Sequence, residues 1–161
     1  MLEVRYVADH GLRGERGPRL LRYLLQRGAD ELAISVMALQ DTPAPFADAF
    51  EDEMAPFARG VAPRRTPASP PATNVVHPVR LWSFDDRSLR HLLSFLDDGL
   101  FHCPPGPDGW LEDLAIYRAG ELVLGLVSHE LEGVLCLTAE EHAEVARLDI
   151  PSQPTAEWIG Y

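Results

Sequence analysis

Three strand-length apolar runs follow one another in the last third of the chain, and they constrain its fold more than any other feature. They span residues 111–118, 121–127 and 131–137, and only two and three residues separate them. Connections this short join antiparallel neighbours, because a parallel pair needs a crossover of a dozen or more residues. The middle run carries apolar residues on both sides of a strand, which is typical of a covered strand. The sequence therefore predicts a C-terminal three-stranded antiparallel meander.

Helical periodicity occurs between the extended segments. Residues 89–96 have leucines at i, i+3, i+4 and i+7, which is one face of a helix, and Asp85 or Asp86 can cap it. A Thr138–Glu141 capping box opens another helix. Further helices are expected near 18–28 and 46–57, and further strands at 2–6, 32–39 and 75–84. This order predicts the α+β class, as a mixed sheet with the C-terminal meander and four helices packed on it.

The length of 161 residues favours a single domain, which we place at 1–161. Residues 59–74 read RGVAPRRTPASPPATN, with no periodicity and many prolines. We interpret this segment as a Pro-rich loop, and a sub-boundary near residue 70 is the alternative. Pro78 cannot donate to a strand ladder, so the strand after the loop is expected to lie at an edge or to begin there.

Charge is distributed unevenly along the chain. The net charge is −11, from 25 acidic residues and 14 arginines, and there is no lysine. Residues 1–80 are neutral, whereas residues 81–161 carry fifteen acids and only four arginines. An acidic surface repels phosphate backbones, so a nucleic-acid partner is not expected. The arginine-only usage, together with abundant alanine, leucine, proline and glycine, favours a GC-rich bacterial origin.

The sequence gives no sign of export or membrane insertion. No apolar run approaches the roughly 20 residues that a bilayer requires, so a membrane partner is not expected. The N-terminus lacks a basic region followed by an apolar stretch, and we therefore expect a cytoplasmic protein. Cys103 and Cys136 form no CxxC spacing and are interpreted as reduced and structural.

No motif for nucleotide binding, serine hydrolysis or zinc proteolysis occurs, and we predict no catalytic, cofactor-binding or metal-ligating residue. Ser128, His129 and Glu130 have the residue types of a hydrolytic triad, but they are adjacent. Triads normally assemble from distant segments, so a turn is the simpler interpretation. The alternative is a small enzyme or metal-binding protein whose site is assembled from His77, His102, Cys103 and His129.

Acidic and aromatic side chains lie on or between the meander strands and form the candidate partner-binding set. Its members are Glu112, Asp113, Tyr117, Glu121, His129, Glu130 and Glu132. Such a surface can steer a basic protein toward it. We therefore expect a small acidic protein-binding module, most concretely an immunity-type inhibitor of a basic bacterial toxin, which it resembles in size and charge. A module that docks through the Pro-rich segment 59–74 is a further alternative.

Overall fold

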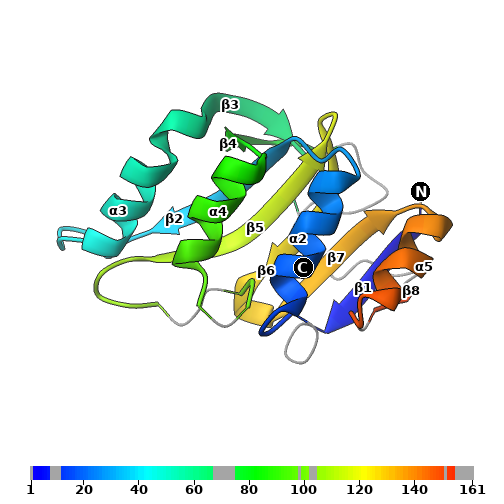
Figure 1. The fold of residues 1–161 in the computed structure, drawn as a ribbon. Helices are drawn as coiled ribbons and strands as arrows, with labels where there is room; N and C mark the ends of the chain where they lie inside the picture. The colour runs from blue at the N-terminus through cyan, green and yellow to red at the C-terminus, as the bar shows by residue number, and fades with distance from the viewer. Residues whose placement is uncertain are drawn as a thin grey trace.

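The computed structural model describes residues 2–7, 12–66, 75–97, 99–101, 105–150 and 152–154. Within them an eight-stranded sheet carries helices along one face (Figure 1). The strands are β1 (Leu2–Val7), β2 (Glu31–Met37), β3 (Ala58–Arg64), β4 (His77–Ser83), β5 (Trp110–Arg118), β6 (Glu121–Val127), β7 (Glu132–Leu137) and β8 (Gln153–Pro154). The helices are α2 (Arg16–Gln26), α3 (Pro45–Met54), α4 (Asp86–Phe95) and α5 (Ala139–Arg147), with 3₁₀ turns η1 (Ala55–Phe57) and η2 (Ser128–Glu130).

The α+β prediction is confirmed, and its details are confirmed in part. The strand order is β3-β4-β2-β5-β6-β7-β1-β8. Strands β5, β6 and β7 pair antiparallel in succession, as the short turns predicted. They form the middle of a larger sheet, however, because β5 also pairs with β2 and β7 with β1. The expectation of a mixed sheet is wrong for the described strands, since all of their pairings are antiparallel.

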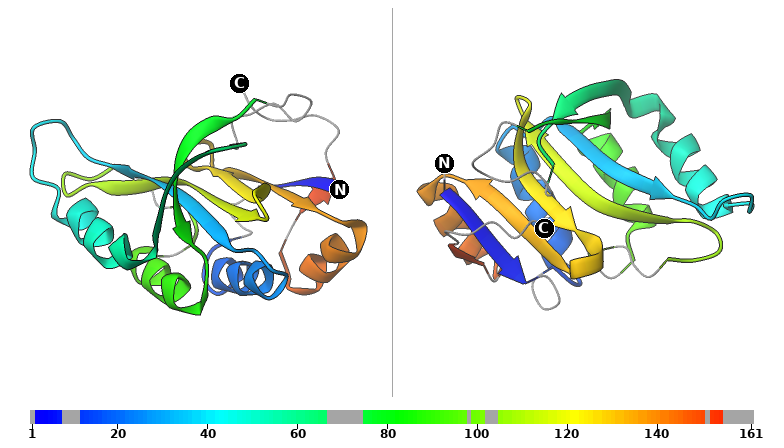
Figure 2. Two further views of the ribbon diagram at one scale, coloured as in Figure 1. Left: turned by 90° about the horizontal axis from the view of Figure 1, so that it is seen from above. Right: turned by 180° about the vertical axis from the view of Figure 1, so that it is seen from behind.

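The four described helices lie side by side against one face of the sheet, in the order α3, α4, α2, α5 (Figure 2). Strands β3 and β4 rise from the opposite face in the same view. None of the helices in the described ranges has the length and apolar character needed to span a bilayer.

Alternation along the strands divides the buried residues between the two faces. On β5, Leu114 and Ile116 belong to the main core beneath the helices. Ala115 and Tyr117 belong to a second cluster on the other face, where they pack with Leu81 of β4. This division follows from the two-residue period of a strand, which sends neighbouring side chains to opposite sides.

The Pro-rich segment is the clearest departure from the sequence prediction. Residues 58–64 form β3, which pairs with β4 along its whole length, and residues 67–74 lie outside the described part. A pattern search misses β3 because it is an exposed edge strand with almost no buried side chain to set a period. The short strand β8, which pairs antiparallel with β1, was also missed, since two residues are too few to show a period.

The predicted caps are present. Asp85 accepts hydrogen bonds from the backbone N–H groups of Arg87 and Ser88, at 2.8 and 2.9 Å, and so opens α4. Thr138 Oγ1 accepts from the Glu141 N–H at 3.2 Å, while the Glu141 carboxylate accepts from the Thr138 N–H at 2.9 Å. Both helix starts are therefore determined by local sequence.

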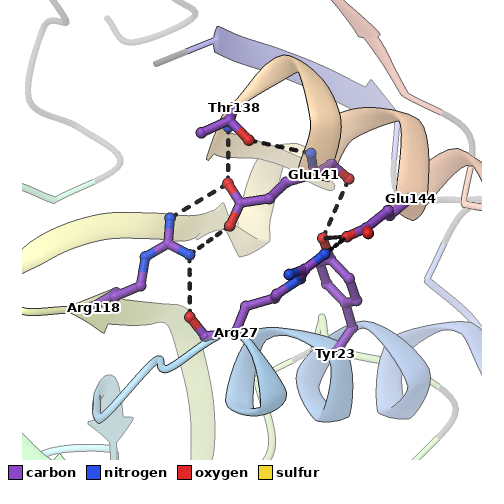
Figure 3. Close-up of polar contacts among 6 residues, drawn as sticks. All are labelled: Tyr23, Arg27, Arg118, Thr138, Glu141 and Glu144. Atoms are coloured by element: carbon purple, nitrogen blue, oxygen red, sulfur yellow. Dashed lines mark hydrogen bonds and ion pairs between the residues drawn. The ribbon is translucent and has the colours of Figure 1, made fainter.

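Glu141 also joins its helix to the sheet (Figure 3). Its carboxylate accepts from Arg118 of β5 at 2.5 Å, although the Glu141 residue is only 8 % exposed. The Arg118 guanidinium and the Thr138 cap lower the pKa of Glu141 from 4.5 to about 2, against the opposing effect of burial. One carboxylate thus serves a helix cap and an ion pair together.

A second set of contacts ties α5 to α2. Glu144 accepts from the Tyr23 hydroxyl at 2.7 Å and pairs with Arg27, and the Tyr23 hydroxyl also lies 3.4 Å from the Glu141 carbonyl (Figure 3). Burial and the bond to Glu144 raise the pKa of Tyr23 to about 12. These contacts place α5 beside α2 at the end of the helix layer.

Leu124→Ala should destabilise the protein by about 2–5 kcal/mol, because Leu124 is fully buried in the main core and its truncation leaves a cavity. Val61→Ala is the matched control, since Val61 is 69 % exposed and its truncation should change stability by less than about 0.5 kcal/mol. Urea unfolding of both variants measures the difference. Equal effects would contradict the assignment of the core.

Glu141→Gln should destabilise the protein at pH 7 by about 1–3 kcal/mol, because it removes a charge-assisted hydrogen bond at a buried position. The carboxylate contributes stability above its ordinary pKa of 4.5 and loses it as pH falls toward about 2, so the gap to wild type should close over that range. The exposed neighbour Glu140 provides the control Glu140→Gln. A gap that does not change between pH 7 and pH 3 would contradict this role, as measured by urea unfolding.

Candidate functional site

Strand β4 pairs with β2 over only two residues, and a cleft opens beside this short pairing. The paired positions are Glu31 with Ser83 and Leu32 with Trp82. Beyond them β4 leaves the plane of the sheet and, with β3, stands over the helix-free face (Figure 2). The rest of β2 continues in the sheet beside β5.

The cleft has a volume of about 600 Å³, which lies in the range of small-ligand and peptide pockets. Strands β2, β5 and β6 line it from the sheet. Strand β4 lines it from the other side, as part of the hairpin that β3 and β4 form together. Its main apolar residues are Ile34, Val36, Met37, Val79, Leu126 and Val127, and its main polar or charged residues are Ser35, Glu51, Thr66, Arg80, Asp113 and His129. The surface is therefore largely apolar, with a few polar groups that can fix an orientation.

Contacts to β2 and β5 hold the hairpin over the sheet. Glu31, at the start of β2, accepts from Arg64 at 2.6 Å and lies 3.6 Å from Arg59, both on β3. The Tyr117 hydroxyl donates to the Arg65 carbonyl at 2.9 Å. Tyr117 is fully buried, and this burial raises its pKa. The tyrosine therefore acts as a neutral hydrogen-bond donor beneath the hairpin.

Strand β4 is also fixed from its other side. Arg80 forms an ion pair with Glu51 of α3 at 2.5 Å, and its guanidinium lies 4.8 Å from the centre of the Trp82 ring. Trp82 packs edge-on against Phe50 in the core, with ring centroids 6.0 Å apart. The wall of the cleft is thus held in place by contacts of both polar and apolar kinds.

A β-bulge in β5 lies at the end of the cleft that is next to η2. The register of β2 and β5 shifts between Ala33 and Ser35, and Asp113, opposite this shift, has a left-handed backbone with φ of 54°. Asp113 and Ser128 exchange two hydrogen bonds: the Asp113 N–H donates to Ser128 Oγ at 2.7 Å, and the Ser128 N–H donates to Asp113 Oδ1 at 2.8 Å. Bulges often occur beside functional sites, where they redirect a side chain.

The structure brings some of the sequence-predicted partner residues together and separates others. Asp113, Tyr117 and His129 line the cleft, although Tyr117 is too buried to contact a partner without rearrangement. Glu112 lies next to Asp113 and accepts from Trp110 Nε1 at 2.7 Å.

The remaining three predicted residues lie on β6, η2 and β7. Glu130 follows His129 in η2, and Glu132 begins β7. Glu121 lies opposite Arg118 in the register of β5 and β6, at the other end of β6 from η2. It therefore belongs to a different part of the surface.

Arginines from the first half of the chain neutralise part of the acidic second half. Glu144 pairs with Arg27, the residue that caps the C-terminus of α2, and Asp149 pairs with Arg16 at 2.6 Å. Within the described residues no arginine lies at ion-pair distance from Glu112, Asp113 or Glu130, and Glu130 is 3.8 Å from the exposed His129. Un-neutralised carboxylates are therefore found beside the bulge at the end of the cleft.

The histidine and cysteine alternative finds no assembled site in the described residues. His77 and His129 are both exposed, on β4 and η2, and only His129 lines the cleft. His102 and Cys103 lie outside the described residues. No group of three or more metal-binding side chains occurs among those that are described. Ser128, His129 and Glu130 form the 3₁₀ turn η2, as the sequence suggested, and the Ser128 hydroxyl accepts a hydrogen bond from the Asp113 N–H of β5.

Sequence reasoning missed the cleft and the residues of its wall. Val79 and Arg80 lie in the cleft with β2 only because the hairpin folds back over the sheet, whereas Trp82 is paired with Leu32. Pro78 indicated an edge strand or a strand start; β4 does begin there, at His77, but it lies between β3 and β2 and is not an edge strand. The direction in which such a strand leaves the sheet is not encoded in the local pattern.

Comparison of the chain with protein-family models, curated proteins and solved structures gives no match. Function is therefore inferred from the geometry and charge of the site alone.

Ser128→Ala should expose the Asp113 amide to exchange, because the buried hydroxyl is the acceptor for that N–H. We expect amide exchange at Asp113 to accelerate by about tenfold or more, and stability to fall by about 1–3 kcal/mol. Ser94→Ala is the control, since Ser94 is exposed on α4 and its hydroxyl donates only to a carbonyl of its own helix. Unchanged exchange at Asp113, measured by NMR, would show that the bulge does not depend on Ser128.

Proposed function

We propose that the chain is a cytoplasmic, non-enzymatic protein-binding module whose partner is basic and contacts the helix-free face of the sheet. The observation that carries the proposal is the apolar cleft of about 600 Å³ with un-neutralised carboxylates at one end. Apolar area supplies affinity, and the unpaired charge supplies orientation and a faster encounter. An immunity-type inhibitor of a basic bacterial toxin is the most concrete form of such a module.

Two features of the fold support an interaction surface on this face. The opposite face is covered by four helices, so its apolar residues are already buried. The hairpin is fixed by Glu31, Tyr117 and Arg80, and a wall held in this way can bind with little reorganisation. Strands from both sides of residue 70 alternate in one sheet, and we therefore treat 1–161 as a single domain in this proposal.

The test is binding to basic proteins, chosen first from those encoded beside this chain and then from purified bacterial nucleases. We expect a Kd in the micromolar range or tighter for at least one of them, by isothermal titration calorimetry. The association rate, measured by stopped-flow fluorescence, should fall by about tenfold between low and physiological salt, because it is steered by charge. Absence of binding across both sets would contradict the proposal.

Two matched double variants test which carboxylates steer the partner toward the chain. Glu112→Gln with Glu130→Gln should lower the association rate about tenfold, because both carboxylates lie beside the bulge at the end of the cleft. Glu121→Gln with Glu140→Gln removes the same charge at exposed positions elsewhere and should have little effect. Equal losses in the two variants would mean that only net charge matters and that this face is not the interface.

A further inference from the structure

We propose that the partner contributes an extended basic segment, which enters the cleft and pairs with the free edge of β2 as an additional strand. This inference rests on the proposed function and specifies how the partner is held.

The edge of β2 is available because its pairing with β4 ends early. Strand β5 pairs with β2 from Glu31 to Met37, whereas β4 reaches only Leu32. From Ala33 onward, the side of β2 that faces away from β5 has no strand neighbour among the described residues. An edge with open backbone donors and acceptors is a template for another extended chain.

The cleft follows this edge. All five residues from Ala33 to Met37 line it, although successive side chains of a strand point to opposite faces. A pocket over one face alone would contact every second residue, so the cleft also opens along the backbone edge of the strand. At about 3.3 Å per residue, the free edge is about 17 Å long and accommodates about five residues of an added strand.

The side walls define the chemistry of the occupant. Val79 on β4 and Val127 on β6 offer apolar contacts, and the exposed side chains of Met37 and Leu39, 36 % and 50 % exposed, continue the apolar surface past the end of β2. Alternate side chains of an added strand would face this surface, which favours apolar residues at every second position.

The charged residues near the cleft indicate which charge the other positions of the added strand should carry. Arg80, the one arginine that lines the cleft among the described residues, is already paired with Glu51. Asp113 also lines it, and Glu112 is its neighbour in the chain. A segment that carries arginine or lysine complements this end of the cleft, whereas an acidic segment would be repelled.

The experiment uses the full chain and two phage-displayed peptide libraries of about eight residues, a length ordinary for a strand. One library alternates apolar residues with arginine or lysine, and the other alternates apolar residues with aspartate or glutamate. We expect binders from the basic library only. The best peptide is then synthesised, and its binding is measured by fluorescence anisotropy and by NMR with the ¹⁵N-labelled chain.

Three measurements test the mode of binding. The peptide should slow amide exchange in β2 between Ile34 and Met37. N-methylation of alternate peptide amides should weaken binding by about tenfold or more on the edge that pairs with β2, because two to three backbone hydrogen bonds are lost. Met37→Lys should weaken binding similarly, while Val61→Lys, at an exposed apolar position on β3 outside the cleft lining, should not.

The outcomes separate this inference from the proposed function. If basic proteins bind with the expected charge dependence but N-methylation has no effect and the β2 amides are unchanged, strand addition is wrong and the proposed function stands. If the acidic library binds as well as the basic one, or neither binds, strand addition is overturned. Failure of basic proteins and basic peptides together overturns both.

Discussion

The departure of β4 from β2 after two paired residues is the constraint on which the shape of this molecule depends. If β4 paired with β2 along its whole length, β2 would have no free edge and no cleft would open between the two strands. The hairpin is instead drawn across the sheet by Glu31 to β3 and by the Tyr117 hydroxyl to the Arg65 carbonyl. The cleft, the free edge of β2 and the burial of Tyr117 all follow from this one arrangement.

Ion pairs connect the helices on the other face of the sheet to the acidic region that follows β7. Helix α2 brings Arg16 and Arg27 beside the acidic region after β7, where they pair with Asp149 and Glu144. The charge asymmetry of the linear chain is thereby reduced on the folded surface, because opposite charges that are far apart in sequence become neighbours. What is left unpaired near the cleft is a smaller and more local group of carboxylates, and this local surplus supports a directed interaction better than net charge does.

Local patterns predicted most of the secondary structure and little of the site. The leucine spacing of α4, the caps at Asp85 and Thr138 and the short turns of the meander each act over a few residues, and each is confirmed. Strand β3 was missed because an exposed edge strand needs no apolar period. His91 of α4 lies 2.8 Å from Glu53 on the neighbouring helix. Its partner comes from another element, so the local pattern could not reveal it.

The sequence by itself determined the α+β class, the helix starts and the antiparallel meander, because propensity, capping and turn length act between residues close along the chain. It also determined that acids outnumber arginines. Only the tertiary structure decided which acids are neutralised, where β4 leaves the sheet and which residues form the cleft. These depend on contacts between residues far apart in the chain, such as Glu31 with Arg64, 33 residues apart, and Asp113 with Ser128, 15 residues apart, and no local pattern specifies such pairs.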